Sequence, residues 1–290
     1  MKYYLKKLHM NYEKTFFKIQ SKVLDFYSEL PFNIYDSIET AAKKIDSNNA
    51  LTAYPPLKKI FDDENIKKII DIGSGGGWFI NSLSSLYPDK DMLGVDFNKV
   101  AVDYANKVSK KKNLKCRFER KNIFELNDVK DTYDFASSLG VLHHTPDCHI
   151  GIKIISNMLK KNSYFFLGLY HKYGREPFLD YFRNMESLTE EKKFEKFKEL
   201  RNLENEKHAF SWFRDQVLHP HETLHTFEEI NNLFKSLNFK IISTSINKFS
   251  ENFLEKDIIE LEKKCYDISK ERLNEKKYYP GFFIILAQKC

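Results

Sequence analysis

The sequence lacks the features of an exported, disulfide-bonded or membrane-embedded protein. It has only four cysteines in 290 residues, and none of them belongs to a C-x-x-C pair. Such scattered cysteines exclude a disulfide framework and favour a reduced, cytoplasmic setting. No apolar run approaches the length needed to cross a bilayer. Residues 1–7 carry charges with no apolar stretch after them, so a signal peptide is not predicted.

The charge distribution argues against a nucleic-acid-binding protein. The chain has 47 basic and 41 acidic residues and a net charge of +6, which is mild for that class. Basic and acidic side chains are interleaved, as in residues 189–207, and a solvated helical face accounts best for this pattern. The length allows one large α/β domain, or such a domain with a small cap.

The most informative stretch is a glycine-rich turn between a short apolar run and a helix-like segment. Residues 69–72 form the apolar run, and Gly73, Gly75 and Gly77 follow it. Glycine is needed where the backbone turns sharply or lies against a ligand. The dinucleotide pattern G-x-G-x-x-G fails because its sixth position is Trp78, and the sequence has no Gly-Lys-Ser/Thr of a P-loop.

Strand-like and helix-like segments alternate along most of the chain. Strands are predicted at residues 69–72, 91–95, 115–119, 133–138, 163–169, 239–245 and 281–287. Helices are predicted at residues 78–86, 98–110, 148–159 and 227–237. Such alternation favours a parallel sheet, in which ligands bind beyond the carboxyl ends of the strands. Asp96 follows the second strand, where it can either accept hydrogen bonds from ribose hydroxyls or cap the next helix.

Two segments resemble motifs of the class I S-adenosylmethionine-dependent methyltransferases. Residues 71–77 match D-x-G-x-G-x-G, and residues 139–147 resemble the fourth motif of that family. The resemblance spans roughly residues 55–170 and 226–290. It implies an α/β fold with a Rossmann-like, seven-stranded, mostly parallel sheet whose last strand is antiparallel. A helical N-terminal segment and a helical lid insertion would be added to this sheet.

The resemblance also implies S-adenosylmethionine as the cofactor, together with the residues that hold it. These residues are Asp71, Gly73, Ser74, Gly75, Gly77, Asp96, Phe97, Asn122, Ile123 and Leu139. In the family, the loop at Asn122 and Ile123 places a polar side chain on the adenine amino group and an apolar side chain on the adenine face. Many relatives have Asp where this chain has Asn122.

The resemblance divides the chain into four parts. They are an N-terminal helical segment (1–54), a cofactor-binding core (55–170), a helical lid or acceptor insertion (171–225) and the C-terminal part of the core (226–290), which carries a helical insert at 251–277. A helix at residues 12–30 would present Phe16, Phe17, Val23, Leu24 and Phe26 on one apolar side. With the helices expected at about 176–216, it would cover the acceptor and exclude water.

Several candidate acceptor residues lie outside the common core. An L-Y-x-x-Y-G-R loop at 169–175, D-Q at 215–216 and H-P-x-E-x-x-H-T at 219–226 resemble a bacterial subgroup of the family. The residues expected to bind the acceptor are His143, Tyr170, Arg175, Asp215 and His219, with His144 or His219 as the candidate base. Arg175 would suit a carboxylate or a phosphate. The alternative is that these groups only tie the lid to the core.

Residues 221–225 spell H-E-x-x-H, the zinc motif of metalloproteases. That motif works only on a helix, where both imidazoles share one face. Pro220 precedes the motif here, and Thr226 with Glu229 forms a capping box that starts a helix after it. We therefore predict no metal. The alternative of an ion held by His219, His221 and His225 stays open.

The expected function is methyl transfer from S-adenosylmethionine to an oxygen or nitrogen of a small-molecule acceptor. The competing hypotheses are an RNA or protein methyltransferase and a non-catalytic nucleotide-binding protein. Residues 138–141, Ser-Leu-Gly-Val, stand where enzymes that methylate base amino groups carry Asn/Asp-Pro-Pro-Tyr/Phe. Methyl transfer depends mainly on holding two reactants in line. The acceptor, the use of a base and the oligomeric state therefore stay open.

Overall fold

The computed structural model describes residues 2–290, with side chains from Tyr12 onward. Its strands are β1 (Lys68–Ile72), β2 (Asp91–Asp96), β3 (Arg117–Arg120), β4 (Tyr133–Leu139), β5 (Leu159–Tyr170), β6 (Phe239–Thr244) and β7 (Phe282–Lys289). They form one seven-stranded sheet in the order β3-β2-β1-β4-β5-β7-β6. The five neighbours β3, β2, β1, β4 and β5 pair in parallel, and β7 runs antiparallel to both β5 and β6. The predicted Rossmann-like sheet with an antiparallel last strand is confirmed.

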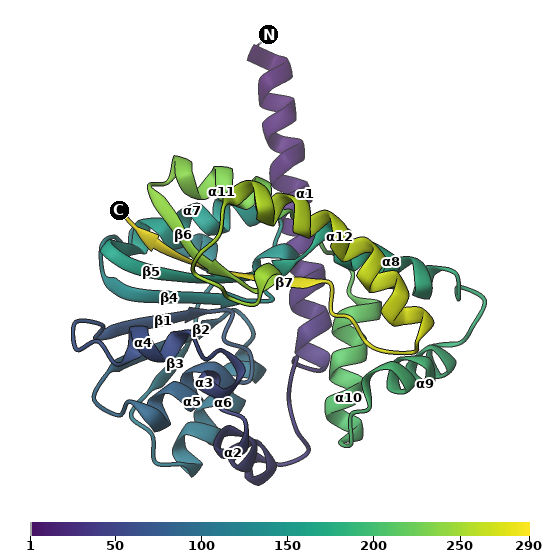
Figure 1. Cartoon of the computed structure of the whole chain (residues 1–290), viewed down its shortest axis with the longest axis horizontal. Coiled ribbons are helices and arrows are strands. Elements are labelled where there is room, and N and C mark those ends of the chain that lie inside the picture. Colours follow the sequence, from purple (N-terminus) through teal and green to yellow (C-terminus); the bar gives the residue numbers. More distant parts are fainter. Residues whose placement is uncertain (1) are drawn as a thin grey trace.

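Two layers of helices cover the sheet (Figure 1). On one face lie α3 (Ala50–Ala53), α4 (Leu57–Phe61), α5 (Trp78–Leu86) and α6 (Lys99–Lys111), with α2 (Ile38–Ser47) packed on α5 and α6. On the other face lie α7 (Cys148–Met158), α11 (Phe227–Ser236) and α12 (Glu255–Asn274). Alternate residues of a strand point to opposite faces. Ile69 accordingly packs in the first layer, and Ile70 and Ile72 pack in the second.

Short polar side chains cap the N-termini of two helices that follow parallel strands. Asn98 caps α6 by accepting the N–H of Val100, and Asp147 caps α7 by accepting the N–H of Ile150. Such side chains satisfy N–H groups that have no partner inside the helix. Because β2, β1 and β4 are parallel neighbours, these helix starts and the glycine turn meet at one edge of the sheet. The carboxyl edge therefore holds the glycine turn after β1 and the loops after β2 and β4.

An N-terminal helix, α1 (Lys2–Glu29), passes across this edge and extends beyond the rest of the molecule (Figure 1). It begins earlier than the predicted start at residue 12. Val23 is buried and Phe26 is partly buried, as expected. The prediction for Phe17 is wrong, because its side chain is 64% exposed. The buried stripe of α1 therefore lies in its C-terminal half, where the helix meets the sheet.

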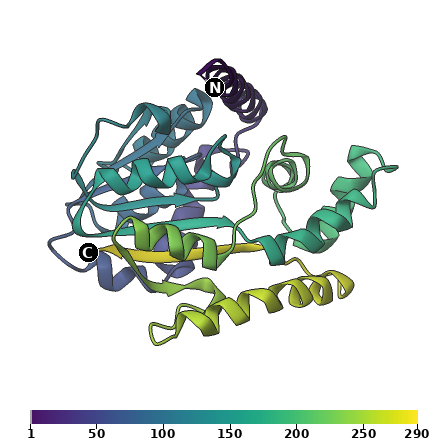
Figure 2. The same cartoon turned by 90° about the horizontal axis from the view of Figure 1, so that it is seen from above.

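Four further helical segments form a lobe beyond one end of the sheet (Figure 2). They are α8 (Lys172–Arg183), α9 (Glu190–Arg201), α10 (Glu206–Phe213) and the π-helical turn η3 (Arg214–Leu218). Phe178, Phe197 and Phe213 are fully buried in the centre of this lobe. Arg214 of η3 pairs with Glu29 at the end of α1 (2.6 Å). The insertion and α1 are therefore joined to each other as well as to the sheet.

No helix in the described part of the chain is long and apolar enough to cross a membrane.

Candidate active site

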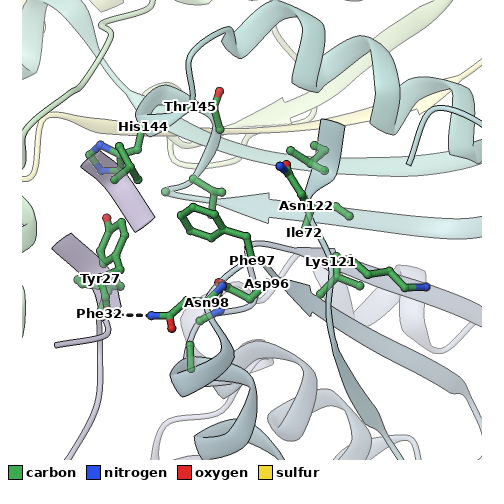
Figure 3. A pocket seen from close by; sticks show the side chains of 18 of the residues that line it. Tyr27, Phe32, Ile72, Asp96, Phe97, Asn98, Lys121, Asn122, His144 and Thr145 are labelled. Atoms are coloured by element: carbon green, nitrogen blue, oxygen red, sulfur yellow. Dashed lines mark hydrogen bonds between the residues drawn. The ribbon is translucent and has the colours of Figure 1, made fainter. Parts of the chain in front are cut away.

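A cavity opens at the carboxyl edge of the sheet, where β1, β2 and β4 end. It encloses about 890 Å³, with the open solvent at its mouth included. Its walls come from α1, the ends of the three strands, the loop after β3 and the turn η2 (Leu142–His144). Figure 3 shows Phe97 near the middle, with Tyr27 and His144 on one side and Asn122 and Lys121 on the other. The cavity therefore has two ends of different chemistry.

The glycine turn reaches the cavity through Gly73 and Gly75. Gly73, Gly75 and Gly77 have positive φ angles of 72°, 50° and 77°, which other residues adopt only at a cost. A Cβ at Gly73 would lie 2.4 Å from Val141, and one at Gly77 would lie 2.6 Å from Ala105. A Cβ at Gly75 would meet no described atom within 4 Å. Packing therefore requires two of these glycines, whereas Gly75 keeps open space beside the cavity.

Asp96 lies at the end of β2 and is buried in the cavity wall. Its oxygens accept the N–H groups of Gly75 (2.9 Å) and Asn98 (2.8 Å). Burial raises the pKa of Asp96, although these N–H groups oppose the shift. Each carboxylate oxygen has a second lone pair, so Asp96 can also accept hydrogen bonds from a ligand. The helix-capping role that the sequence left open for Asp96 belongs to Asn98.

The loop after β3 forms the opposite end of the cavity. Asn122 caps the short helix η1 (Ile123–Glu125) by accepting the N–H of Phe124 (3.1 Å). Ile123 and Phe124, the next two residues of the loop, also line the cavity and add apolar surface. Lys121 also lines this end and pairs with Glu119 (2.8 Å). An amide next to apolar side chains suits a flat heteroaromatic ring with polar edges.

Three of the residues predicted to hold the cofactor, Asp71, Ser74 and Gly77, do not line the cavity. Asp71 is buried beside β4 and accepts a hydrogen bond from Ser137 (2.7 Å). Burial raises the pKa of Asp71 to about 7, although the Ser137 hydroxyl opposes the shift. In this structure Asp71 ties β1 to β4, and Gly77 lets α5 pack closely on α6.

His144 combines burial with a free acceptor atom. Its side chain lines the cavity, and its Nδ1 lies 2.9 Å from the carbonyl oxygen of His221. Because a carbonyl only accepts, Nδ1 carries the proton and Nε2 keeps its lone pair. Nε2 is buried and has no hydrogen-bond partner among the described residues. Burial lowers the pKa of His144 to about 3, although the His221 carbonyl opposes the shift, so the imidazole is neutral at pH 7.

A buried carboxylate lies next to this imidazole. Oδ1 of Asp215 is 3.8 Å from Nε2 of His144. The two oxygens of Asp215 accept the hydroxyl protons of Tyr27 (2.6 Å) and Tyr170 (3.0 Å). Burial raises the pKa of Asp215, against the effect of His219 and the two tyrosines. Asp215 thus joins α1, β5 and η3 at the end of the cavity occupied by His144.

His219 stacks on the other side of His144, with ring centroids 3.6 Å apart. Its Nδ1 accepts the N–H of His221 (3.1 Å), so the proton of the neutral ring sits on Nε2. Burial and the neighbouring His144 lower the pKa of His219 to about 2, against the effect of Asp215. His219 does not line the cavity. His219 therefore holds the ring of His144 in position and is not placed to bind an acceptor in the cavity.

Arg175, Tyr170 and His143 also lie behind the cavity wall. Arg175 is fully buried, and two of its nitrogens donate to Glu222 (3.2 and 2.8 Å). Its guanidinium lies 4.0 Å from the centre of the Tyr170 ring. His143 accepts the N–H of Tyr170 through Nδ1 (3.1 Å). These contacts support the alternative in which such groups tie the insertion to the core; Nη1 of Arg175 has no hydrogen-bond partner among the described residues, but Arg175 does not line the cavity.

The H-E-x-x-H residues lie in an extended segment rather than in a helix. Glu222 pairs with Arg175, and His221 lies 3.2 Å from the carbonyl oxygen of Thr145 through Nε2. The predicted capping box of Thr226 and Glu229 is present at the start of α11. The helical zinc motif of a metalloprotease is therefore excluded.

Several cavity residues were not predicted from the sequence. They are Gln20, Val23, Tyr27, Pro31, Phe32, Ile72, Val95, Asn98, Ala101, Lys121, Phe124, Gly140, Val141, Thr145 and Pro146. The apolar pattern of α1 indicated a buried side, and Tyr27 follows Phe26 on that side. The pattern carried no information on which strand ends α1 would cover.

Comparisons with known proteins agree with this architecture. A family profile described as "Methyltransferase domain" matches residues 63–218, more than half of the chain. The ubiquinone biosynthesis O-methyltransferase of Pelagibacter ubique is 30% identical over 117 residues, which are 40% of this chain and 45% of that protein. The match thus spans less than half of this curated relative.

Solved structures share the fold at low sequence identity. The magnesium protoporphyrin IX methyltransferase of Synechocystis PCC 6803, solved with bound S-adenosylmethionine, has a TM-score of 0.51 at 12% identity, and the alignment covers 94% of this chain and 97% of that one. A methyltransferase of Methanosarcina mazei has a TM-score of 0.50 at 19% identity, over 81% and 97% of the two chains. At this identity the likeness concerns the fold.

Proposed function

Since the chain belongs to the family of methyltransferase domains, we propose that it transfers the methyl group of S-adenosylmethionine to a hydroxyl oxygen of an uncharged small molecule. The observation that carries this proposal is the neutral, buried His144, which belongs to the cavity wall as Gly75 and Asp96 do and whose Nε2 has no hydrogen-bond partner among the described residues. The match to this family confirms the resemblance to methyltransferases that residues 71–77 and 139–147 indicated.

The residues at the carboxyl edge fit the cofactor. Gly75 leaves space that any Cβ would enter, and Asp96 keeps lone pairs for ribose hydroxyls. Asn122 and Ile123 offer an amide and an apolar face to adenine. When bound, S-adenosylmethionine supplies an electrophilic methyl group. With adenine between Asn122 and Ile123, the reactive end would lie toward Tyr27 and His144.

His144 acts on the proton of the acceptor. A hydroxyl must lose its proton as its oxygen attacks carbon, and a neutral imidazole within reach can take that proton on Nε2. The resulting imidazolium would lie beside Asp215, whose carboxylate is held by Tyr27 and Tyr170. An opposite charge at this distance favours the protonated imidazole.

The walls indicate an apolar acceptor. Val23, Pro31, Phe32, Val141 and Pro146 contribute apolar side chains to the cavity walls. Arg175, the cation that the sequence offered for an acceptor anion, is bound to Glu222 behind the wall. An anionic acceptor would therefore lose its hydration without gaining a partner. The name of the Pelagibacter ubique relative supports oxygen as the methylated atom.

The cover over the cavity favours a small molecule over RNA or protein. The C-terminal half of α1 contributes Gln20, Val23 and Tyr27 to the walls, and the bond from Tyr27 to Asp215 ties it to the insertion. A flexible macromolecule would have to displace this cover to reach His144. The non-catalytic alternative makes a different prediction, namely cofactor binding without transfer to any acceptor.

Two measurements test the proposal in sequence. Calorimetry with S-adenosylmethionine should give a dissociation constant near the micromolar range, or about −8 kcal/mol. Labelled methyl transfer should then be measured to phenols, alcohols and amines of matched size, with RNA and protein as further acceptors. We expect label on apolar hydroxyl compounds. Binding of the cofactor with label only on RNA or protein would contradict the small-molecule proposal, and the absence of binding to folded protein would contradict the cofactor.

A further inference from the structure

A second cluster of polar side chains lies outside the cavity, where α7 meets the start of α11. His149 comes from the first turn of α7, His225 from the extended segment, and Glu229 from the first turn of α11. One nitrogen of each histidine and one oxygen of Glu229 all lie within 4.8 Å of one another. The side chains of His149 and Glu229 are 44% and 35% exposed, whereas His225 is buried. None of the three lines the cavity.

The two imidazoles point at the same carboxylate oxygen. Oε1 of Glu229 lies 2.6 Å from Nε2 of His149 and 2.9 Å from Nδ1 of His225. Both nitrogens donate protons there, because a carboxylate only accepts. A divalent metal could replace both protons, since neutral imidazole nitrogens and a carboxylate oxygen are its usual ligands. The half-exposed His149 and Glu229 can make the small shift to metal–ligand distances of about 2.0–2.2 Å.

Neighbouring groups already orient two of the three ligands. Nε2 of His225 lies 2.9 Å from the hydroxyl of Thr223, which in turn lies 3.2 Å from the carbonyl oxygen of His143. With Nδ1 on a metal, Nε2–H donates to Thr223, and Thr223 donates to that carbonyl. The second oxygen of Glu229 accepts the N–H of Thr226 (3.4 Å). Metal-bound histidine and carboxylate ligands are usually held by such outer hydrogen bonds.

We propose that His149, His225 and Glu229 form a binding site for a divalent transition metal such as Zn²⁺, with solvent completing the coordination. The site shares only His225 with the set that the sequence suggested, His219, His221 and His225. The ion would clamp α7 to the segment that precedes α11. It takes no part in methyl transfer, because its ligands lie outside the cavity.

Metal binding by the full-length protein, purified without a histidine tag and treated with a chelator, tests this site. Calorimetry with ZnCl₂ should show one ion per chain, and thermal unfolding should shift to higher temperature with Zn²⁺ because the ion binds the folded state. CoCl₂ should give visible absorption bands of a low-coordinate site with nitrogen and oxygen ligands. His149→Ala should abolish saturable binding, and this half-exposed position is expected to leave the fold intact.

Two further variants separate a built site from casual binding. Glu228→Gln is the matched control for Glu229→Gln, because Glu228 is exposed on the same turn of α11 and lies outside the cluster. It should bind Zn²⁺ like the wild type, whereas Glu229→Gln should not. Thr223→Val should weaken Zn²⁺ binding about 10- to 100-fold, the usual effect of losing an outer-shell partner. Unchanged Zn²⁺ affinity in His149→Ala, or the absence of binding in the folded wild type, would overturn the proposal.

Discussion

The two ends of the cavity are built in different ways. At the end proposed for the cofactor, the backbone of the glycine turn, Asp96 and the cap residue Asn122 come from three strand ends and their loops. At the His144 end, side chains from α1, η2, η3 and the segment after it meet around Asp215. The first end depends on local turns and strand order. The second depends on how distant segments pack, so a single substitution should affect the two ends differently.

The largest effect is expected from Gly75→Val, which tests the first end. The new side chain would enter the open space beside the cavity, and its positive φ would cost about 1–3 kcal/mol. Calorimetry should detect no binding of S-adenosylmethionine to the folded variant. Gly76→Ala is the matched control, because its Cβ would lie 3.4 Å from Tyr104, an ordinary contact. Cofactor affinity within tenfold of the wild type in Gly75→Val would place the cofactor elsewhere.

His144→Ala tests the second end. Loss of a general base should lower kcat/KM about 10²- to 10⁴-fold, while the cofactor affinity stays nearly unchanged because His144 faces the acceptor. With a phenolic acceptor the deficit should shrink as the pH rises, because the phenol then ionises without help. Steady-state kinetics between pH 6 and 10 would show this. A deficit that stays constant with pH would indicate a structural role for His144 instead.

Asp96→Ala should have a smaller effect, confined to the cofactor. Removing a charged hydrogen-bond partner of the ribose should weaken binding by about 1.5–3 kcal/mol, or about 10- to 150-fold. Asp103→Ala, at an exposed position on α6 where the carboxylate pairs with Lys99, serves as the control in the same calorimetric titration. Equal affinities of the two variants would show that Asp96 only shapes the loop through Gly75 and Asn98.

This difference between the two ends explains what could be predicted from the sequence. The sheet, the turn at Gly75 and the acid at Asp96 follow from local patterns, because a strand, a tight turn and a helix start dictate their own geometry. The same patterns do not tell a ligand-facing glycine from one required by packing. The packing role of Gly77 depends on the position of Ala105 on α6, and no local sequence pattern contains that position.

The His144 end could be predicted only in part, because its partners are set by tertiary contacts. The sequence offered Arg175 as a clamp for an acceptor anion, yet Arg175 lies behind the cavity wall and binds Glu222 (2.8 Å) through two of its nitrogens. The amphipathic pattern of α1 did not single out Tyr27. Its role follows from the path of α1 across the edge of the sheet, which brings Tyr27 to Asp215. The polar character of these residues was visible in the sequence, whereas their pairing was not.

The last expected effect concerns stability rather than catalysis, and it tests the packing of the His144 end. Burial lowers the pKa of His219 to about 2, whereas the unfolded chain takes up this proton near pH 6.5. The unfolded state therefore binds more protons below pH 6.5, and the free energy of unfolding falls by about 1.4 kcal/mol for each pH unit of acidification because of this one group.

His219→Phe keeps an aromatic ring beside His144 and removes the titration. Urea unfolding of both proteins at pH 6, 5 and 4 should show a shallower loss of stability in the variant by that amount per unit. The opposite contribution of Asp71, whose pKa is raised, cancels in this difference. Parallel pH profiles would mean that the folded protein protonates His219 as readily as the unfolded chain, and that Asp215 holds it as an imidazolium.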